Sequence, residues 1–91
     1  RIEPVGRAPM QAATGISFRR SEAGHAMDWH TAPRRQYVIT LSGQAEIEVG
    51  DGTVRRLGPG DVLLAEDLTG RGHITRAVGG QARVSAAIPL A

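Results

Sequence analysis

Turn-forming residues interrupt this chain at short intervals, and they limit what it can fold into. The sequence holds 12 glycines and 5 prolines in 91 residues. Turn signals recur about every 8–12 residues along it, and no stretch between them has apolar residues at the spacing of an amphipathic helix. This pattern predicts short strands in an all-β sandwich or barrel.

Eight strand segments are predicted between the turns. They are residues 16–21, 26–31, 36–41, 45–49, 53–57, 61–65, 73–78 and 81–88. From Glu46 to Val49 apolar and acidic residues alternate, which is typical of a strand with one face in water. The run 61–65 is apolar after its first residue, which predicts a strand buried on both faces. We therefore expect a small antiparallel jelly-roll β-barrel.

The composition fits one folded domain. Hydrophobic residues make up 41% and charged residues 22% of the chain, proportions found in soluble globular domains. We expect residues 1–14 to form an N-terminal arm and residues 15–91 a single barrel. Cysteine is absent, which excludes disulfides and thiolate chemistry and favours a cytoplasmic location. No apolar run approaches the roughly 18 residues that span a bilayer, so we expect no membrane partner.

The basic character of the chain does not predict nucleic-acid binding. The isoelectric point is about 10.4, yet the chain has 11 basic and 9 acidic residues, so its formal net charge is only +2. Every basic residue is arginine, and the arginines are scattered along the sequence. Nucleic-acid binding needs a basic stripe, usually with stacking aromatic residues, and the chain has one Trp, one Tyr and one Phe. We therefore expect no nucleic-acid partner.

Two glycines flank a motif in which polar residues stand at fixed intervals. Gly24 is followed by HAMDW, then by His30-Thr31-Ala32, PRR, Gln36 and YVITLS, and the motif ends at Gly43. This arrangement resembles the first motif of the cupin superfamily, which runs Gly, five residues, His-x-His, three or four residues, Glu, six residues and Gly. Every interval fits. Ala32 stands where the family has its second histidine, and Gln36 stands where it has the glutamate.

The second cupin motif is also partly present. The run from Leu57 to Val62, LGPGDV, resembles the turn and strand that open it. Arg71 stands where the family has a histidine, and His73 follows two residues later. The resemblance covers roughly Gly15 to Leu90 and implies the small single-domain RmlC-like barrel fold.

The resemblance also implies a metal site in the barrel. A typical cupin metal is held by three imidazoles and a carboxylate. Here the candidate ligands are His30, Gln36 and His73, with Glu66 or Asp67 as a carboxylate, for one zinc, iron, nickel or manganese ion. Alternatives remain open: His30 as a hydrogen-bonded interior residue, His73 as a loop cap, and Gln36 as a partner for a backbone group.

Other polar residues are candidates for ligand binding. One of Arg34 and Arg35 is expected to point at the cavity mouth, where a guanidinium binds a carboxylate or phosphate, unless both are simply solvated. Tyr37 could donate a hydrogen bond in the cavity or pack its strand. Strand alternation sets His25 opposite to His30, so we expect His25 to face away from the cavity.

The acidic pair after the predicted strand 61–65 has two interpretations. Glu66 and Asp67 are either a solvated loop start, or one of them pairs with Arg71 or Arg34 or acquires a raised pKa and a proton-transfer role.

These observations predict a cupin-like barrel that binds a small polar or anionic organic molecule. The expected catalytic residues are His30 and His73, and Arg34, Gln36, Tyr37, Glu66 and Asp67 are expected to bind substrate. If the protein is an enzyme, the resemblance implies isomerase, epimerase, lyase or oxygenase chemistry; the alternative is a non-catalytic binding or sensor barrel. A domain this small also favours a homodimer formed through sheet or arm pairing.

Overall fold

The computed structural model describes residues 9–30, 34–66 and 72–91, with the backbone alone for residues 28–30. Its strands are β1 (Ser17–Ser21), β2 (Ala26–His30), β3 (Gln36–Ser42), β4 (Gln44–Val49), β5 (Val54–Leu57), β6 (Val62–Ala65), β7 (His73–Val78) and β8 (Arg83–Pro89). All eight predicted strands are confirmed, each within two residues of its expected bounds. The described residues contain no helix, and so no helix that could cross a membrane.

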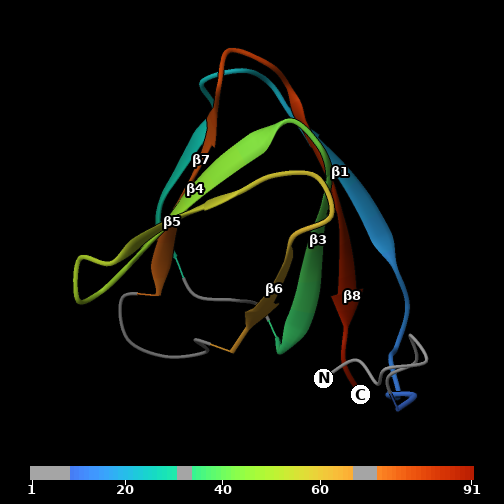
Figure 1. Ribbon diagram of the computed structural model, residues 1–91. Helices are drawn as coiled ribbons and strands as arrows, with labels where there is room; N and C mark the ends of the chain where they lie inside the picture. The colour runs from blue at the N-terminus through green and yellow to red at the C-terminus, as the bar shows by residue number, and fades with distance from the viewer. Residues whose placement is uncertain (1–8, 31–33, 67–71) are drawn as a thin grey trace.

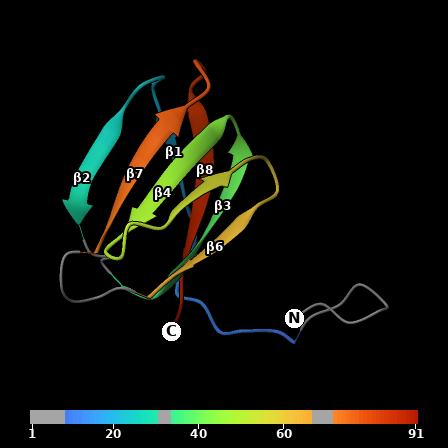
Figure 2. The same ribbon diagram turned by 60° about the vertical axis from the view of Figure 1, so that its left-hand side comes forward.

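The strands form two four-stranded antiparallel sheets. One sheet has the order β1-β8-β3-β6 and the other β2-β7-β4-β5. Figure 1 shows the two sheets as opposite walls of an open arch, and Figure 2 shows β2 at the outer edge of the second wall. Only the β4–β5 hairpin stays within one sheet; every other connection between consecutive strands passes from one sheet to the other. The predicted all-β jelly-roll barrel is confirmed.

Glycine is required at the turn between β3 and β4. Gly43 has φ of 74°, a left-handed conformation that side chains other than glycine rarely adopt. A Cβ atom at this position would also overlap the carbonyl oxygen of Ala82. The turn can therefore pack against the segment that leads into β8 only when residue 43 lacks a side chain.

The turn before β6 is fixed by its aspartate. Asp61 accepts a hydrogen bond at Oδ2 from the backbone N–H of Gly58 (2.8 Å) and donates its own N–H to the Gly58 carbonyl (3.0 Å). The N–H of Gly60 donates to the carbonyl oxygen of Thr40 (2.8 Å), and the N–H of Thr40 donates to that of Asp61 (3.1 Å). These bonds attach the Pro-Gly-Asp turn to β3.

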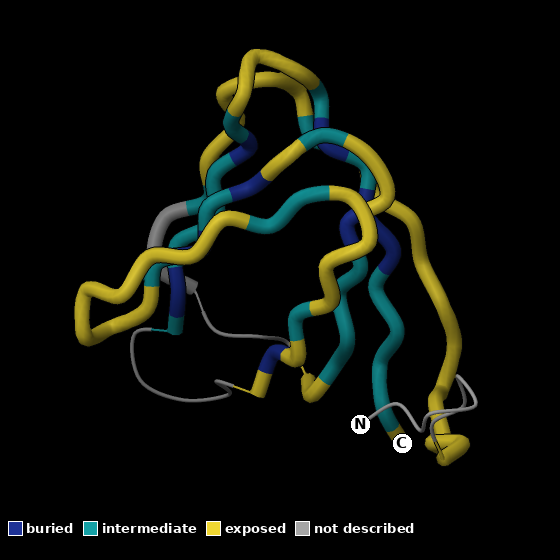
Figure 3. Tube along the Cα trace, in the orientation of Figure 1, coloured by how far each residue is buried: buried dark blue, intermediate teal, exposed yellow. Residues whose placement is uncertain are grey.

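Most of the buried apolar side chains between the sheets are small. They are Ala45, Ala65 and Ala77, together with Ile47, whereas Ala86 is buried on the outer face because its neighbours Ser85 and Ala87 line the cavity. Figure 3 shows that buried segments are short and separated by half-buried and exposed chain. Because alanine fills little volume, the two sheets leave a space between them, which makes the inner surface of the barrel the place to look for a site.

The alternation predicted from Glu46 to Val49 holds at Ile47 but not at Val49, and the burial predicted for β6 is wrong. Ala45 and Ile47 are buried and Glu46 and Glu48 are half-buried, whereas Val49 at the end of the strand is 38% exposed. In β6, Leu63 and Ala65 line the barrel interior, but Val62 is 56% and Leu64 37% exposed. The reason is that β6 is an edge strand with one covered face.

The described end of the N-terminal arm runs beside the C-terminal end of the chain. Ala13 forms an isolated antiparallel bridge with Leu90, and the N–H of Thr14 donates to the carbonyl oxygen of Pro89 (2.9 Å). Residues 1–8 of the predicted arm lie outside the described residues.

Candidate functional site

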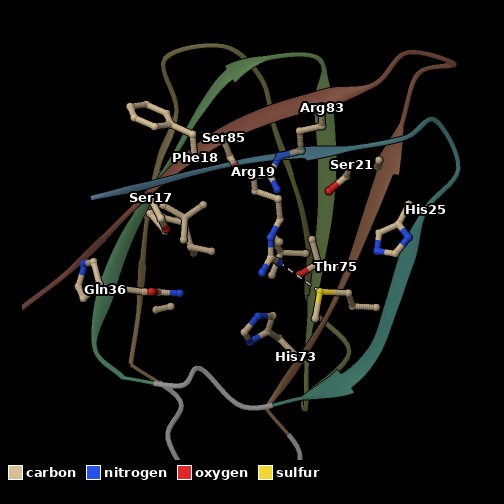
Figure 4. Close-up of a pocket in the computed structure, with 18 of the residues that line it drawn as sticks. Ser17, Phe18, Arg19, Ser21, His25, Gln36, His73, Thr75, Arg83 and Ser85 are labelled. Carbon is tan, nitrogen blue, oxygen red and sulfur yellow. Dashed lines mark hydrogen bonds between the residues drawn. The ribbon is translucent and has the colours of Figure 1, made fainter. Parts of the chain in front are cut away.

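A cavity of about 870 Å³ lies between the two sheets. It is lined by inward-facing residues of β1, β3, β6 and β8 from one sheet and of β2, β4 and β7 from the other. Figure 4 shows the polar side chains in two groups, with Gln36 and His73 toward one end and Arg83, Ser21 and Ser85 toward the other. The cavity therefore offers polar contacts at both ends, with apolar residues such as Val38 and Leu63 between them.

Two of the predicted site residues lie toward the same end of the cavity. His73 is the first residue of β7 and is 8% exposed. Gln36 is the first residue of β3 and is half-buried. Both line the cavity, and they come from different sheets. A small molecule at this end would contact an imidazole and an amide, each of which can donate or accept a hydrogen bond.

The backbone of β2 brings His30 into register with His73. Met27 lies opposite Thr75, and His30 lies opposite His73, so β2 has one more residue than β7 between these pairs. This is a β-bulge, which shifts the alternation of a strand by one position. Met27, Thr75 and His73 all line the cavity. The bulge thus gives His30 a cavity-lining residue as its register partner.

His25 does not face away from the cavity as strand alternation predicted. It lines the cavity, and Figure 4 shows its imidazole beside the inner wall. The prediction placed His25 and Met27 in the outward phase of the strand, but Met27 also lines the cavity. Alternation therefore holds from His25 to Met27, and the carbonyl oxygen of His25 accepts a hydrogen bond from the N–H of Ala77 in β7 (2.8 Å). The bulge between Met27 and His30 breaks the phase that the prediction carried back from His30.

The two neighbouring arginines at the entry of β3 have different surroundings. Arg34 is exposed and lines the cavity. Arg35 binds Glu66, with its Nη2 and Nε atoms 2.8 and 2.9 Å from Oε1 of that carboxylate. The partner of Glu66 is therefore Arg35, not Arg34 as one interpretation had it. Asp67 and Arg71 lie outside the described residues.

Glu66 contributes to a smaller space beside the main cavity. This second cavity measures about 350 Å³ and is shared by Glu66, Leu63 and His73. Glu66 is exposed, and its carboxylate is already engaged by a guanidinium. It lines this second cavity and not the main one.

Tyr37 is placed away from the cavity. Its neighbours Gln36 and Val38 line the cavity, whereas Tyr37 does not. Its hydroxyl donates a hydrogen bond to Oε1 of Gln11 (2.9 Å). Successive residues of a strand point to opposite faces of the sheet, so Gln36 and Tyr37 cannot both face inward. Tyr37 contacts the N-terminal arm, a geometry that does not fit the expected role in ligand binding.

Sequence reasoning missed two arginines in the cavity. Arg83 begins β8, is 6% exposed and lines the cavity. Its Nη2 and Nε atoms donate to Oγ1 of Thr40, at 3.0 and 3.4 Å. Arg19 reaches the cavity from β1. Burial first, and the positive charge of Arg19 second, lower the pKa of Arg83 below its usual value.

A sequence signal for these arginines was available. Arg83, Ser85 and Ala87 alternate in β8, and all three line the cavity. In the sequence, these three residues alternate with apolar ones near the end of the chain, and they lie outside both cupin motifs. Alternation alone predicts which residues share a face, but it does not predict which face is inside.

The described side chains fall short of a complete metal site. Among them, no group of three or more His, Asp or Glu residues lies close enough to hold a metal ion. His73 offers one imidazole and Gln36 a neutral amide oxygen, while a divalent metal site usually has about three or four protein ligands. The candidate site thus depends on His30, which is described by its backbone alone.

Solved structures of known proteins have folds similar to that of this chain. No protein-family model and no curated protein matches the sequence significantly. Among solved structures, a double-stranded β-helix protein from Klebsiella pneumoniae is 21% identical with a TM-score of 0.64, over 96% of this chain and 80% of that one. An RmlC-like cupin from Desulfovibrio desulfuricans is 20% identical with a TM-score of 0.58, over 88% and 81% of the two chains.

A third similar structure belongs to a regulator. It is the cupin domain of an XRE-family transcriptional regulator from Enterobacter cloacae, which is 18% identical with a TM-score of 0.56 over 84% of this chain and 82% of that one. At these identities the likeness concerns the fold, so the site has to be interpreted from this chain's own residues.

Proposed function

Because this chain has the cupin fold, we propose that its barrel binds a small polar or anionic organic molecule between the two sheets. The observation that carries the proposal is the cavity of about 870 Å³, lined by both sheets. Ligand sites typically measure about 300–1,000 Å³ and combine apolar walls with a few polar groups. Gln36 and His73 supply such groups at one end, and Arg34 also lines the cavity.

Binding without catalysis is the form of the proposal that the described residues support best. His73 and Gln36 can orient a ligand through hydrogen bonds without any chemical step. A similar cupin domain belongs to a transcriptional regulator of Enterobacter cloacae, which agrees with a binding or sensing role. This chain would then act as a small-molecule binding module.

A pair of tryptophan variants tests the proposal. Leu63 lines the cavity, whereas Val54 is 49% exposed and lines neither cavity. We would screen a library of sugars, polyols and organic acids by the amide NMR shifts of cavity residues, and then repeat the titration with Leu63→Trp and Val54→Trp. A tryptophan at 63 occupies cavity volume and should weaken binding by at least about tenfold, whereas one at 54 should leave it unchanged. Equal affinity in both variants would place the ligand outside the barrel.

An enzyme is the second candidate function, favoured by the register of His30 and His73. Residues paired across an antiparallel ladder have Cα atoms about 4.5–5.5 Å apart, a spacing that lets two imidazoles serve one site. His73 could then act as a general acid or base beside a bound substrate. With a third ligand, the same pair could hold a divalent metal, which would supply Lewis-acid chemistry.

Metal content separates the two forms of this candidate. We would measure bound zinc, iron, nickel and manganese in untagged protein and in the His30→Ala and His73→Ala variants, with His25→Ala as the control. Near-stoichiometric metal that is lost in the first two variants and kept in the control would support a shared metal site. If no metal binds after incubation with all four ions, the acid/base form of the candidate is left.

We also propose a homodimer formed through the outer face of the β1-β8-β3-β6 sheet. Val62 and Leu64 lie on this face because their neighbours in β6 line the cavity, and Ile39 lies opposite Val62 in β3. The outer face of the other sheet carries ion pairs instead, such as that of Glu48 with Arg76 (3.1 Å). A second copy that covers the apolar face would bury side chains now in water. Light scattering should then give twice the mass of one chain.

A further inference from the structure

We propose that Arg19 and Arg83 together form an anion-binding site in the cavity, and that its ligand is a small organic dianion carrying phosphate or carboxylate groups. The inference rests on the proposed function and goes further by naming the chemical class of the ligand. Figure 4 shows both side chains directed into the cavity from neighbouring strands, with Arg19 from β1 and Arg83 from β8.

The surroundings of Arg83 are unusual for a buried guanidinium. It is 6% exposed, and its Nε and Nη2 atoms both donate to one neutral hydroxyl, that of Thr40. Within residues 9–30, 34–66 and 72–91, no carboxylate forms an ion pair with it. A buried charge without a counter-charge costs free energy. A ligand anion would supply the missing charge.

Four other arginines in the described part of the chain form ion pairs, as is usual for arginines with a structural role. Arg20, Arg35, Arg56 and Arg76 each pair with a glutamate. Those pairs lie at exposed or half-buried positions. Arg83 differs from them in being both buried and without an acidic partner in the described chain.

Arg19 brings a second positive charge to the same region. Its register partner is Ser85, while Ser21 on the same strand lies opposite Arg83. Its Nη1 atom contacts the sulfur of Met27 at 3.7 Å, another neutral acceptor. Met27 belongs to the opposite sheet, so the Arg19 side chain extends across the cavity while Arg83 stays beside Thr40. Like charges in one cavity repel, and the burial of Arg83 strengthens that repulsion. An anion bound in contact with both guanidiniums would relieve it.

The remaining lining of the cavity suits an organic dianion. Ser17, Ser21 and Ser85 present hydroxyl groups on the same wall as the arginines, and hydroxyls donate readily to phosphate or carboxylate oxygens. None of the described residues that line the cavity is acidic. An inorganic ion would fill a small part of about 870 Å³, and the apolar wall at Val38 and Leu63 can contact a carbon skeleton.

The experiment compares Arg19→Gln and Arg83→Gln with Arg20→Gln. Arg20 is the neighbour of Arg19 in β1, does not line the cavity and pairs with Glu22. The probes are inorganic phosphate, succinate and acetate, titrated at constant ionic strength and followed by amide NMR shifts. Because each lost guanidinium removes charge-assisted hydrogen bonds, we expect the affinity for phosphate or succinate to fall at least about tenfold in the first two variants. Arg20→Gln should bind as the parent does.

Each result supports or overturns the inference. Saturable binding of phosphate alone identifies a phosphate ester as the ligand class, and binding of succinate alone identifies a dicarboxylate; acetate should bind at least about tenfold more weakly than either. Arg19 is exposed, so its variant should fold even if Arg83→Gln does not. Equal affinities in Arg19→Gln and Arg20→Gln overturn the inference.

A neutral probe separates this inference from the proposed function. If glucose or glycerol shifts the amides of cavity residues and none of the anions does, the barrel binds small molecules but the two arginines are not an anion site. If neither neutral nor anionic probes shift those amides, both proposals fail.

Discussion

Thr40 holds the guanidinium of Arg83 through a single atom. Its Oγ1 accepts hydrogen bonds from Nη2 at 3.0 Å and from Nε at 3.4 Å. Thr40 is fully buried, and its backbone also joins β3 to the turn at Gly60 and Asp61. Thr40 of β3 thus holds Arg83 of β8 in the cavity. Thr40 is itself held by its hydrogen bonds to the Pro-Gly-Asp turn.

Thr40→Val should destabilise the protein by about 1–3 kcal/mol, because it leaves a buried charged donor without its acceptor. Urea unfolding monitored by circular dichroism measures the change. Thr40→Ser is the matched control: it keeps the hydroxyl, so it should recover most of the loss. If Val and Ser variants were equally stable, the hydroxyl would have no role in holding Arg83.

Gly43→Ala should destabilise the protein by at least about 2 kcal/mol, since an alanine at φ of 74° is strained. Its methyl group would also meet the carbonyl oxygen of Ala82. The control is Gly50→Ala, a turn glycine without positive φ and with open space around it. That variant should change stability by less than about 1 kcal/mol in either direction. Similar losses at both positions would contradict the backbone argument.

Turn chemistry and alternation carried most of the fold prediction. The strand boundaries could be predicted because glycine and aspartate form the turns between strands, as at Gly43 and the Gly58–Asp61 turn. These residues favour turns through their local backbone geometry. The burial of β6 could not be predicted in the same way. Whether an apolar strand such as residues 62–65 is central or at an edge depends on which strands pair, and in this fold the partners lie far apart in the sequence.

The site was harder to predict than the fold. His73 and Gln36 were found because a spaced motif led to them, and the cavity has both on its wall. Arg19 and Arg83 were not found, because their proximity is created by the pairing of β1 with β8, the first and last strands. The bulge in β2, which sets the register of His30, involves residues that show no distinctive bulge pattern in the sequence.

Asp51 should contribute to the loss of folding stability at acid pH. Hydrogen bonds from the side chain and then the backbone of Thr53 lower its pKa below the ordinary value of 3.8. The unfolded chain therefore binds a proton at this group more readily than the folded one. The stabilisation is fully present above pH 3.8 and is lost as the pH falls through the lower folded pKa.

The Asp51→Asn variant isolates this contribution from that of the other carboxylates. Urea unfolding of both proteins between pH 5 and about pH 2.5 gives the difference in stability as a function of pH. We expect the advantage of the parent protein over the variant to shrink toward the acid end of this range. A difference that is constant across it would mean that Asp51 has the same pKa in the folded and unfolded chains.

Tyr37→Phe should leave ligand affinity unchanged while lowering stability by about 0.5–1.5 kcal/mol, the usual value of one hydrogen bond. The hydroxyl is bonded to Gln11 in the N-terminal arm, not to a cavity residue. Gln36→Ala, on the adjacent cavity-lining residue, is the comparison and should weaken binding. If Tyr37→Phe weakened binding as much as Gln36→Ala, the tyrosine would reach the ligand after all.

Val62→Glu should shift the protein from dimer to monomer, because a carboxylate on the outer face of β6 would have to be buried against the second copy. Val54→Glu is the matched control: Val54 is 49% and Val62 56% exposed, but Val54 lies opposite Glu48 on the charged sheet. Light scattering after size exclusion, at several protein concentrations, measures both variants. Loss of the dimer in Val54→Glu alone would move the interface to the other sheet, and a monomeric parent protein would reject it.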